Sequence, residues 1–151
     1  MPSRPHHPST PVEDSLFVTI LRTADRLGQQ AEGLIKPYGL TSTQYNVLRI
    51  LRGAEPQGLP CRVIAERMIS RDPDMTRLLD RLEKRGYITR ERQTDDRRVI
   101  KTRITGEGLK QLKKLDDPVH KMHQKQFGHM NAARLKQLAE LLDEVGRQES
   151  D

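Results

Sequence analysis

A dense group of basic side chains lies between residues 84 and 103 of the 151-residue chain. This stretch contains eight basic residues and three acidic ones, which accounts for most of the chain's net charge of +6. The basic residues are Lys84, Arg85, Arg90, Arg92, Arg97, Arg98, Lys101 and Arg103. Localised positive charge of this kind is expected of a surface that contacts nucleic-acid phosphates, although a solvated charged face is the simpler alternative.

A second set of polar side chains shares one face of a short helix that begins near residue 74. The opposite face is apolar, with Met75, Leu78, Leu79 and Leu82 at helical spacing. The outward residues are Asp74, Thr76, Arg77 and Arg81, and Arg71 lies in the turn before them. When a helix enters the major groove, side chains near its amino end reach the base edges. Arg77 is suited to a two-nitrogen contact with guanine, worth about 1–3 kcal/mol of discrimination, and Thr76 to a thymine methyl group or a phosphate.

Two acids at the start of this helix would repel phosphates. We expect Asp72 and Asp74 to cap the helix and to offset its dipole, and a contact from Asp74 to a cytosine amino group is the alternative. The alternative for Arg77 and Arg81 is pairing within the helix, since Asp80 and Lys84 stand four residues apart in the favourable order. Such pairs give only about 0.2–0.5 kcal/mol, too little to hold an arginine back from DNA.

The single cysteine and a group of histidines are weaker candidates for chemistry. Cys61 shares an apolar stripe with Ile64, which favours a small buried hydrophobe over a redox sensor. His120, His123 and His129 lie close in sequence and could share a metal, but exposed surface histidines are the expected interpretation. The sequence has no nucleophile elbow, phosphate-binding loop or metalloprotease spacing. We therefore expect neither an enzyme nor a bound cofactor or metal.

Helices must hold these side chains in place. Apolar residues from Leu16 onward repeat at helical spacing until Lys36-Pro37 interrupts them. Thr41 to Gln44 has the pattern of a capping box that opens a short helix ending at Gly53. Pro60 suits the first position of the next helix. That helix, the break after it and the helix that carries Arg77 predict a helix-turn-helix.

A two-stranded hairpin is expected next. Gly86 fits the left-handed end of a helix, and residues 87–92 are strand-like. A charged loop at 93–98 follows, and apolar residues alternate with basic ones over 100–104. A helix-turn-helix that leads into a hairpin is the layout of a winged helix, with the charged loop as the tip of the wing.

The rest of the chain is expected to be helical. Thr105 caps a helix that Asp117-Pro118 is expected to kink, and Asn131 caps a last one. The predicted fold is thus mostly α with a small β-hairpin wing (α+β), a winged helix-turn-helix flanked by long helices. Residues 1–13, rich in proline, are expected to form a disordered tail.

Composition narrows the function. Only 34% of residues are hydrophobic, so the core must be thin or shared with a partner. No apolar run is long enough for a membrane span or a signal peptide, and a single cysteine fits a reducing cytoplasm. Aromatic residues make up only 3%, which disfavours stacking on single-stranded nucleic acid and leaves duplex phosphates as the target.

The chain resembles the MarR family of bacterial transcription regulators from about Leu16 to Val145. The wing carries Asp96-Arg97-Arg98 and then Ile104-Thr105-Gly106-Glu107-Gly108. This is similar to the family's Asp-Arg-Arg pattern followed by Leu-Thr-x-x-Gly. The stretch 77–87, which ends in Gly86-Tyr87, is similar to the family's recognition helix and its exit.

The resemblance implies a homodimer that reads a palindrome in double-stranded DNA. It implies a single domain over 14–147, with dimerisation helices at 14–36 and 105–147 around a winged-helix lobe at 41–104. In the wing it assigns Arg98 to a minor groove, Asp96 to orienting that arginine, and Arg97 to nearby phosphates. It also suggests a small anionic aromatic ligand lined by Tyr38, Tyr45 and Arg49.

We therefore expect a cytoplasmic, sequence-specific regulator, most simply a repressor modulated by a ligand. Two alternatives stay open: a winged helix that binds another protein, and an architectural DNA binder without sequence preference.

Overall fold

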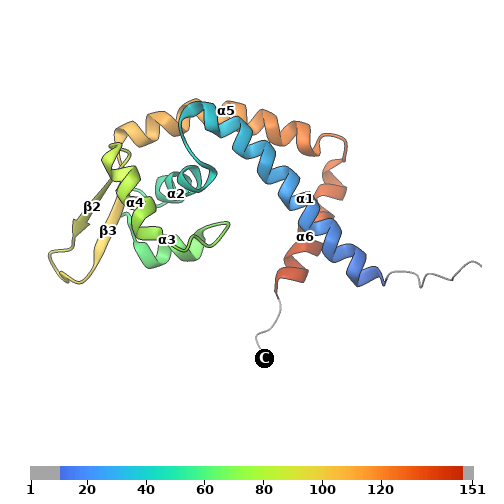
Figure 1. Ribbon diagram of the computed structural model, residues 1–151, viewed down its shortest axis with the longest axis horizontal. Helices are drawn as coiled ribbons and strands as arrows, with labels where there is room; N and C mark the ends of the chain where they lie inside the picture. Colours follow the sequence, from blue (N-terminus) through green and yellow to red (C-terminus); the bar gives the residue numbers. More distant parts are fainter. Residues whose placement is uncertain (1–10, 148–151) are drawn as a thin grey trace, which may run out of the picture.

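The computed structural model describes residues 11–147, and it is mostly helical with one small antiparallel sheet. The elements are α1 (Val12–Ile35), the 3-10 helix η1 (Lys36–Tyr38), α2 (Ser42–Arg52), β1 (Leu59–Pro60), α3 (Cys61–Arg67), α4 (Met75–Lys84), β2 (Ile88–Arg92), β3 (Ile100–Ile104), α5 (Gly106–Phe127) and α6 (Ala132–Gly146). A lobe built from α2, α3, α4 and the sheet lies at one end, and α1, α5 and α6 extend away from it (Figure 1). The predicted winged helix-turn-helix with long flanking helices is confirmed.

The helices begin where the sequence provides caps. The hydroxyl of Thr41 accepts a hydrogen bond from the Gln44 amide, and the Gln44 side chain accepts one from the Thr41 amide, both at 3.1 Å. At the starts of α5 and α6, the side chains of Thr105 and Asn131 accept hydrogen bonds from the Gly108 and Arg134 amides. A cap of this kind contributes about 1 kcal/mol, which helps to fix the first turn of a helix as short as α2.

A third strand lies where a loop was expected. Leu59 and Pro60 of β1 pair with Thr102 and Lys101 of β3, so the strand order is β1-β3-β2. Proline is tolerated there because β1 is an edge strand and Pro60 needs no ladder donor. Pro60 consequently stands just before α3 instead of at its first position.

One helix end also differs from the prediction. α1 begins at Val12, inside the stretch assigned to the tail, and two acids in its first turn suit the positive end of the helix dipole; residues 1–10 of the tail lie outside the described residues. Gly53 closes α2 as expected, in a right-handed conformation, and Gly86 has the expected positive φ of 76°. Pro118, where a kink was expected, lies inside α5, which continues to Phe127.

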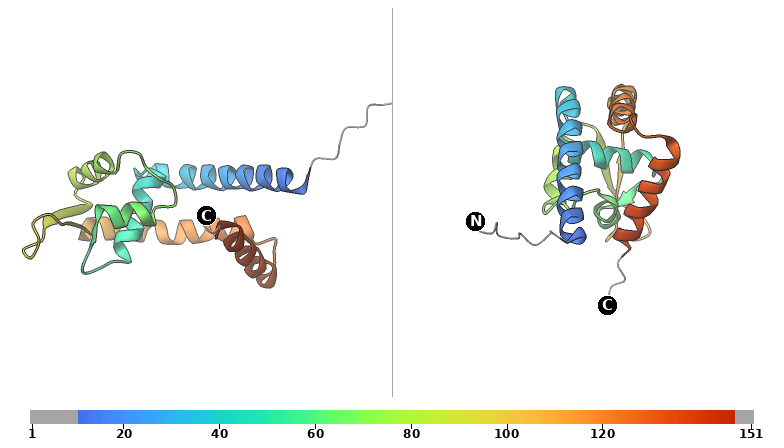
Figure 2. Two further views of the ribbon diagram at one scale, coloured as in Figure 1. Left: turned by 90° about the horizontal axis from the view of Figure 1, so that it is seen from below. Right: turned by 90° about the vertical axis from the view of Figure 1, so that its right-hand side faces the viewer.

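The core lies in the lobe and the inner ends of the long helices. Its fully buried members include Leu48, Leu51, Ile64, Leu79, Leu82, Ile88, Leu112 and Leu115. α1 buries only Ile35, and α6 buries no residue. Both helices instead expose large apolar side chains, namely Val12, Leu16, Phe17, Val18, Leu21, Leu138, Leu141, Leu142 and Val145. Figure 2 shows α1 and α5 projecting from the lobe in the same direction, with α6 at the outer end of α5. The apolar surface of α1 and α6 therefore lies outside the lobe.

Candidate nucleic-acid interface

Helix α4 presents a polar face to solvent. Leu78, Leu79 and Leu82 are buried, and this fixes the helix so that Thr76, Arg77 and Arg81 face outward and are exposed. Arg71 is exposed in the turn before the helix. The structure thus brings together the candidate basic residues of α4 at its open face.

Of the two acids at the start of α4, Asp74 caps the helix as expected, whereas Asp72 binds the amide of Asp74 itself, outside the helix. The side chain of Asp74 accepts a hydrogen bond from the Arg77 amide at 3.0 Å, and Asp72 accepts one from the Asp74 amide at 2.8 Å. Because one oxygen of Asp74 already holds the backbone, the carboxylate shapes the first turn of α4, and its charge offsets the helix dipole there.

The loop between β2 and β3, residues 93–99 and here called the wing loop, carries the candidate arginines at its tip. Its base is closed by a hydrogen bond from the Gln93 amide to the Val99 carbonyl at 2.9 Å. Arg92 donates to the Arg97 carbonyl at 2.8 Å. Arg97 and Arg98 are both exposed, and within residues 11–147 neither takes part in an ion pair.

Asp96 acts on the wing loop differently from the expectation. Its carboxylate accepts a hydrogen bond from the backbone amide of Arg98 at 3.0 Å, and not from the guanidinium. Aspartate commonly binds the amide two residues ahead in a turn, because this local geometry needs no side-chain partner. Asp96 therefore fixes the backbone that presents Arg98 and leaves the side chain unrestrained.

An arginine on the wing ties it to α4. Arg90 of β2 donates to Asp80 at 2.5 Å and to Glu83 at 3.0 Å. The hydrogen bond from Arg90 lowers the pKa of Glu83, and the bond to Glu83 in turn raises the pKa of Arg90. Asp80 thus pairs with a strand of the wing, and the alternative pair with Lys84 does not form among the described residues. The alternation of side chains along β2 could have indicated that Arg90 faces the lobe, because Arg90 lies on the same face of the strand as buried Ile88.

The first turn of α2 also belongs to this surface, which the sequence analysis missed. Thr41 and Thr43 line a hollow of about 180 Å³ together with Asp74, Arg77 and Arg81 of the α4 region. The capping box was visible in the sequence, but only packing places it beside α4.

The comparisons with known proteins agree with this geometry. The MarR family model matches residues 40–100. A crystal structure of a MarR transcription factor from Planctomyces limnophilus is 36% identical to this chain; the alignment covers 91% of this chain and 98% of that one, with a TM-score of 0.68. The chain belongs to the MarR family.

Two further relatives bear on regulation. The PcaV transcriptional regulator from Streptomyces coelicolor, solved in complex with its natural ligand, is 31% identical to this chain. The alignment covers 82% of this chain and 88% of the PcaV chain, with a TM-score of 0.68. The homoprotocatechuate degradative operon repressor of Escherichia coli is 25% identical over 133 residues, 88% of each chain. MarR-family proteins are regulators of transcription, so this chain is assigned to that class.

The residues suggested for a ligand are only partly together in this MarR-family chain. The guanidinium of Arg49 lies 5.9 Å from the centre of the Tyr45 ring, and Tyr45 is 9% exposed and packs in the core. The carbonyl of Tyr38 accepts a hydrogen bond from Gln111 of α5 at 2.6 Å.

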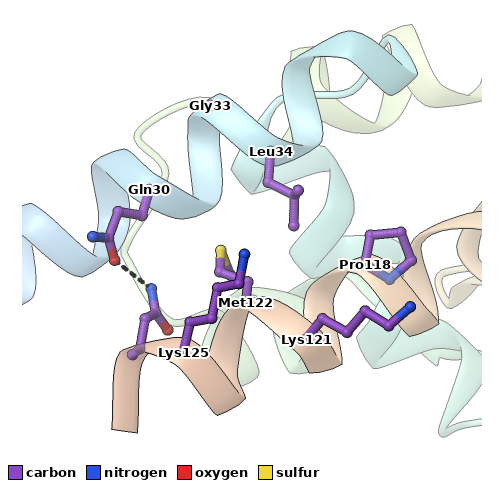
Figure 3. Close-up of a pocket in the computed structure, with 8 residues that line it drawn as sticks. Gln30, Gly33, Leu34, Pro118, Lys121, Met122 and Lys125 are labelled. Atoms are coloured by element: carbon purple, nitrogen blue, oxygen red, sulfur yellow. Dashed lines mark hydrogen bonds between the residues drawn. The ribbon is translucent and has the colours of Figure 1, made fainter. Parts of the chain in front are cut away.

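A separate hollow of about 590 Å³ lies between α1 and α5 (Figure 3). Its lining residues are Gln30, Gly33, Leu34, Pro118, Lys121, Met122, Lys125 and Gln126. A hydrogen bond of 2.8 Å from Gln126 to Gln30 spans the two helices there. None of the three residues suggested for a ligand lines this hollow.

The cysteine and histidines contribute little to the site. Cys61 is half-buried beside the core of the lobe. His123 forms a hydrogen bond with Gln126 at 3.0 Å, and in the part of the chain that the structure describes no three His, Cys, Asp or Glu side chains are placed to hold a metal ion. Between residues 11 and 147, no helix combines the length and apolarity that crossing a bilayer requires.

Proposed function

We propose that this MarR-family chain is a cytoplasmic homodimer that binds a palindromic operator in duplex DNA and represses transcription. The observation that carries the proposal is the pairing, within one lobe, of an arginine face on α4 with a wing loop tipped by arginine. The bonds from Arg90 to α4 hold these two parts in a fixed relation. A helix that reads base edges and a flanking arginine loop that contacts the backbone or minor groove together suit sequence-specific duplex recognition.

In the proposed complex, α4 enters the major groove by its amino end. Arg77 would contact a guanine, and Thr76 a thymine methyl group or a phosphate. Arg71 and Arg81 flank this end and would contact phosphates. Asp74 would support the helix as its cap and make no base contact.

The wing would reach the neighbouring minor groove. A narrow minor groove concentrates negative potential, which attracts an arginine side chain. Arg98 has an exposed side chain on a backbone fixed by Asp96, so it is suited to this role. Arg97 would lie beside it near the phosphates.

The dimer is supported by apolar surface outside the lobe. Phe17 and Leu142 are 64% and 46% exposed, and they represent stripes along α1 and α6 that residues 11–147 of one chain leave uncovered. Apolar stripes of this extent mark a protein interface, and burial of apolar area yields about 25 cal/mol per Å². Two copies would place their α4 helices on half-sites about 10–10.5 base pairs apart.

We extend the proposal to release by a small anionic aromatic ligand. Arg49 is exposed beside the Tyr45 ring and would pair with a carboxylate, and Tyr38 is the third lining residue that the family resemblance suggests. A useful switch requires that the ligand favour the conformation with the wrong half-site distance by a few kcal/mol. Titration of the operator complex with aromatic carboxylates, on the wild type and on Arg49→Ala, tests this part.

The deciding experiment selects bound sequences from a random duplex pool and then measures Arg98→Ala on the selected operator. We expect a palindrome, a log-log salt slope on the order of −6 to −10, and at least about a tenfold loss of affinity for Arg98→Ala with fold and dimer retained. Lys110→Ala is the control, because Lys110 is an exposed cation on α5 that pairs with Glu107 of the same helix.

Two other results would replace the proposal. A shallow salt dependence with no selected sequence indicates a protein-interaction module. A steep salt slope with equal affinity for operator and random duplex indicates an architectural binder.

A further inference from the structure

Three segments meet at the carboxyl end of α4. The chain leaves α4 through Gly86 and Tyr87, and Thr105 at the start of α5 binds both: its amide donates to the Tyr87 carbonyl at 3.0 Å and its hydroxyl to the Gly86 carbonyl at 2.6 Å. The first turn of α5 packs so closely that a Cβ on Gly108 would lie 2.5 Å from the Tyr87 carbonyl oxygen. The end of α4 is therefore joined directly to α5.

The third segment is the turn between α1 and α2. Arg85 is the C-cap residue of α4, and its guanidinium donates a hydrogen bond to the Gly39 carbonyl. The same guanidinium lies 4.9 Å from the centre of the Tyr87 ring and donates to the Tyr87 hydroxyl at 3.3 Å. Gln111 of α5 donates to the neighbouring Tyr38 carbonyl at 2.6 Å. Arg85 and Gln111 thus bind two consecutive carbonyls of the Tyr38–Gly39 turn.

This turn lies where α1 passes into the lobe, and α5 is where the chain leaves it. The junction formed by Arg85, Gln111 and the turn therefore ties α4 to both of the helices that run toward the proposed dimer interface. The Arg85 guanidinium stacks on the Tyr87 ring and binds the Gly39 carbonyl. It lies close to the turn, since a Cβ on Gly39 would be 3.1 Å from Nη2 of Arg85. The planar guanidinium loses little conformational freedom for each hydrogen bond that it forms, so the contact between Arg85 and the turn is stiff.

Arg85 is far from the proposed base contacts. Eight residues separate it from Arg77, which is about 12 Å along a helix axis. Its side chain is also engaged with the turn. A role in holding α4 at a defined distance from the dimer helices thus fits its position better than a contact with bases.

Resting on the proposed dimeric DNA binding, we propose that Arg85 is a positioning residue that sets the half-site spacing of the operator. Two linked binding modules gain affinity only when both half-sites are reached together, so a stiff connection makes the gain depend steeply on spacing. If the junction loosens, the two lobes of the dimer can bind half-sites at several separations. The affinity advantage of one separation over the others then declines. Binding to a single half-site does not change, because it needs no second lobe.

The experiment measures the affinity of the full-length chain for one isolated half-site and for duplexes whose two selected half-sites are separated by different distances. We expect the wild type to prefer one spacing by about tenfold or more, and Arg85→Met to reduce that preference to about threefold or less. The isolated half-site should bind both proteins equally. Lys110→Met removes a positive charge next to the junction and should keep the wild-type spacing profile.

Gln111→Met loosens the same turn without removing a charge and should broaden the profile as well; it also keeps the proposal testable if Arg85→Met fails to fold. An unchanged spacing preference in both variants overturns the role of Arg85 and the junction. An equal loss at every spacing and on the isolated half-site shows instead that Arg85 contacts phosphate, which also overturns it. A wild type that binds no duplex, or binds only as a monomer, overturns the proposed function itself, and this result is seen before any variant is compared.

Discussion

Arg90 on the second wing strand lies 2.5 Å from a carboxylate oxygen of Asp80 on helix α4. The side chain of Arg90 is 24% exposed, and it binds Glu83 one turn further along the same helix. One guanidinium therefore joins the wing to the helix that would read the major groove. This contact between β2 and α4 sets the orientation of the wing relative to the helix.

Replacing Arg90 with methionine should lower the free energy of unfolding by about 1 kcal/mol, because two carboxylates lose a charged hydrogen-bond donor in a partly exposed site. Urea denaturation followed by circular dichroism measures the change. Arg62→Met is the matched control: Arg62 pairs with Glu66 on its own helix and is 78% exposed, so its loss should cost less than about 0.5 kcal/mol. Equal effects of the two variants would contradict a specific role for Arg90.

The same contact predicts a pH dependence. The hydrogen bond from Arg90 lowers the pKa of Glu83 in the folded protein, so the folded state gains stability above the ordinary glutamate pKa of about 4.3 and loses this gain as the pH falls through the lowered value. In Arg90→Met this contribution is missing. The difference in unfolding free energy between wild type and variant should thus be constant from about pH 7 to 5 and narrow below about pH 4. Denaturant titrations at these pH values test it, and a gap that widens in acid contradicts it.

Two glycines in the first turn of α5 should respond oppositely to alanine. A Cβ on Gly108 would lie 2.5 Å from the Tyr87 carbonyl oxygen and 2.7 Å from Cγ1 of Ile104, so Gly108→Ala should destabilise the fold by about 1–3 kcal/mol. A Cβ on Gly106 would meet nothing within 4 Å, so Gly106→Ala should be neutral or stabilise by up to about 1 kcal/mol. Thermal unfolding of both variants decides this, and similar melting temperatures would refute the close packing at Gly108.

Placing charge on the exposed apolar stripes should separate the proposed dimer. Phe17→Glu and Leu142→Glu bury a carboxylate in the interface, so sedimentation should give monomers while the far-UV spectrum stays helical. Ile69 is also apolar and 88% exposed, but it lies in the turn between α3 and α4; Ile69→Glu should keep the dimer. A dimer that persists in both stripe variants would place the interface elsewhere.

Local signals made much of the fold predictable. The capping box at Thr41, the cap at Asp74 and the left-handed Gly86 each act within a few residues, so their geometry follows from the sequence around them. The candidate DNA-binding arginines could be selected because helical periodicity fixes which face of α4 is apolar. β1 was not predictable, since two residues form a strand only where β3 offers an edge.

Contacts between elements were beyond the reach of the sequence. An ion pair of Asp80 with Lys84 was the alternative within the helix, and Asp80 binds Arg90 instead; the packing of Tyr45 in the core was likewise not specified by the sequence. In each case the partner depends on how two elements pack, which periodicity does not specify.

The amino-acid sequence alone determined the order of elements, their caps and the concentration of positive charge around α4 and the wing. These features depend on hydrogen bonds and side-chain spacing within one or two helical turns. Only the tertiary structure decided which charges meet. It showed that Arg90 binds the wing strand β2 to α4 and that Arg85 binds the carboxyl end of α4 to the Tyr38–Gly39 turn. Such pairs join residues up to 46 positions apart, and their formation depends on the packing of the whole lobe.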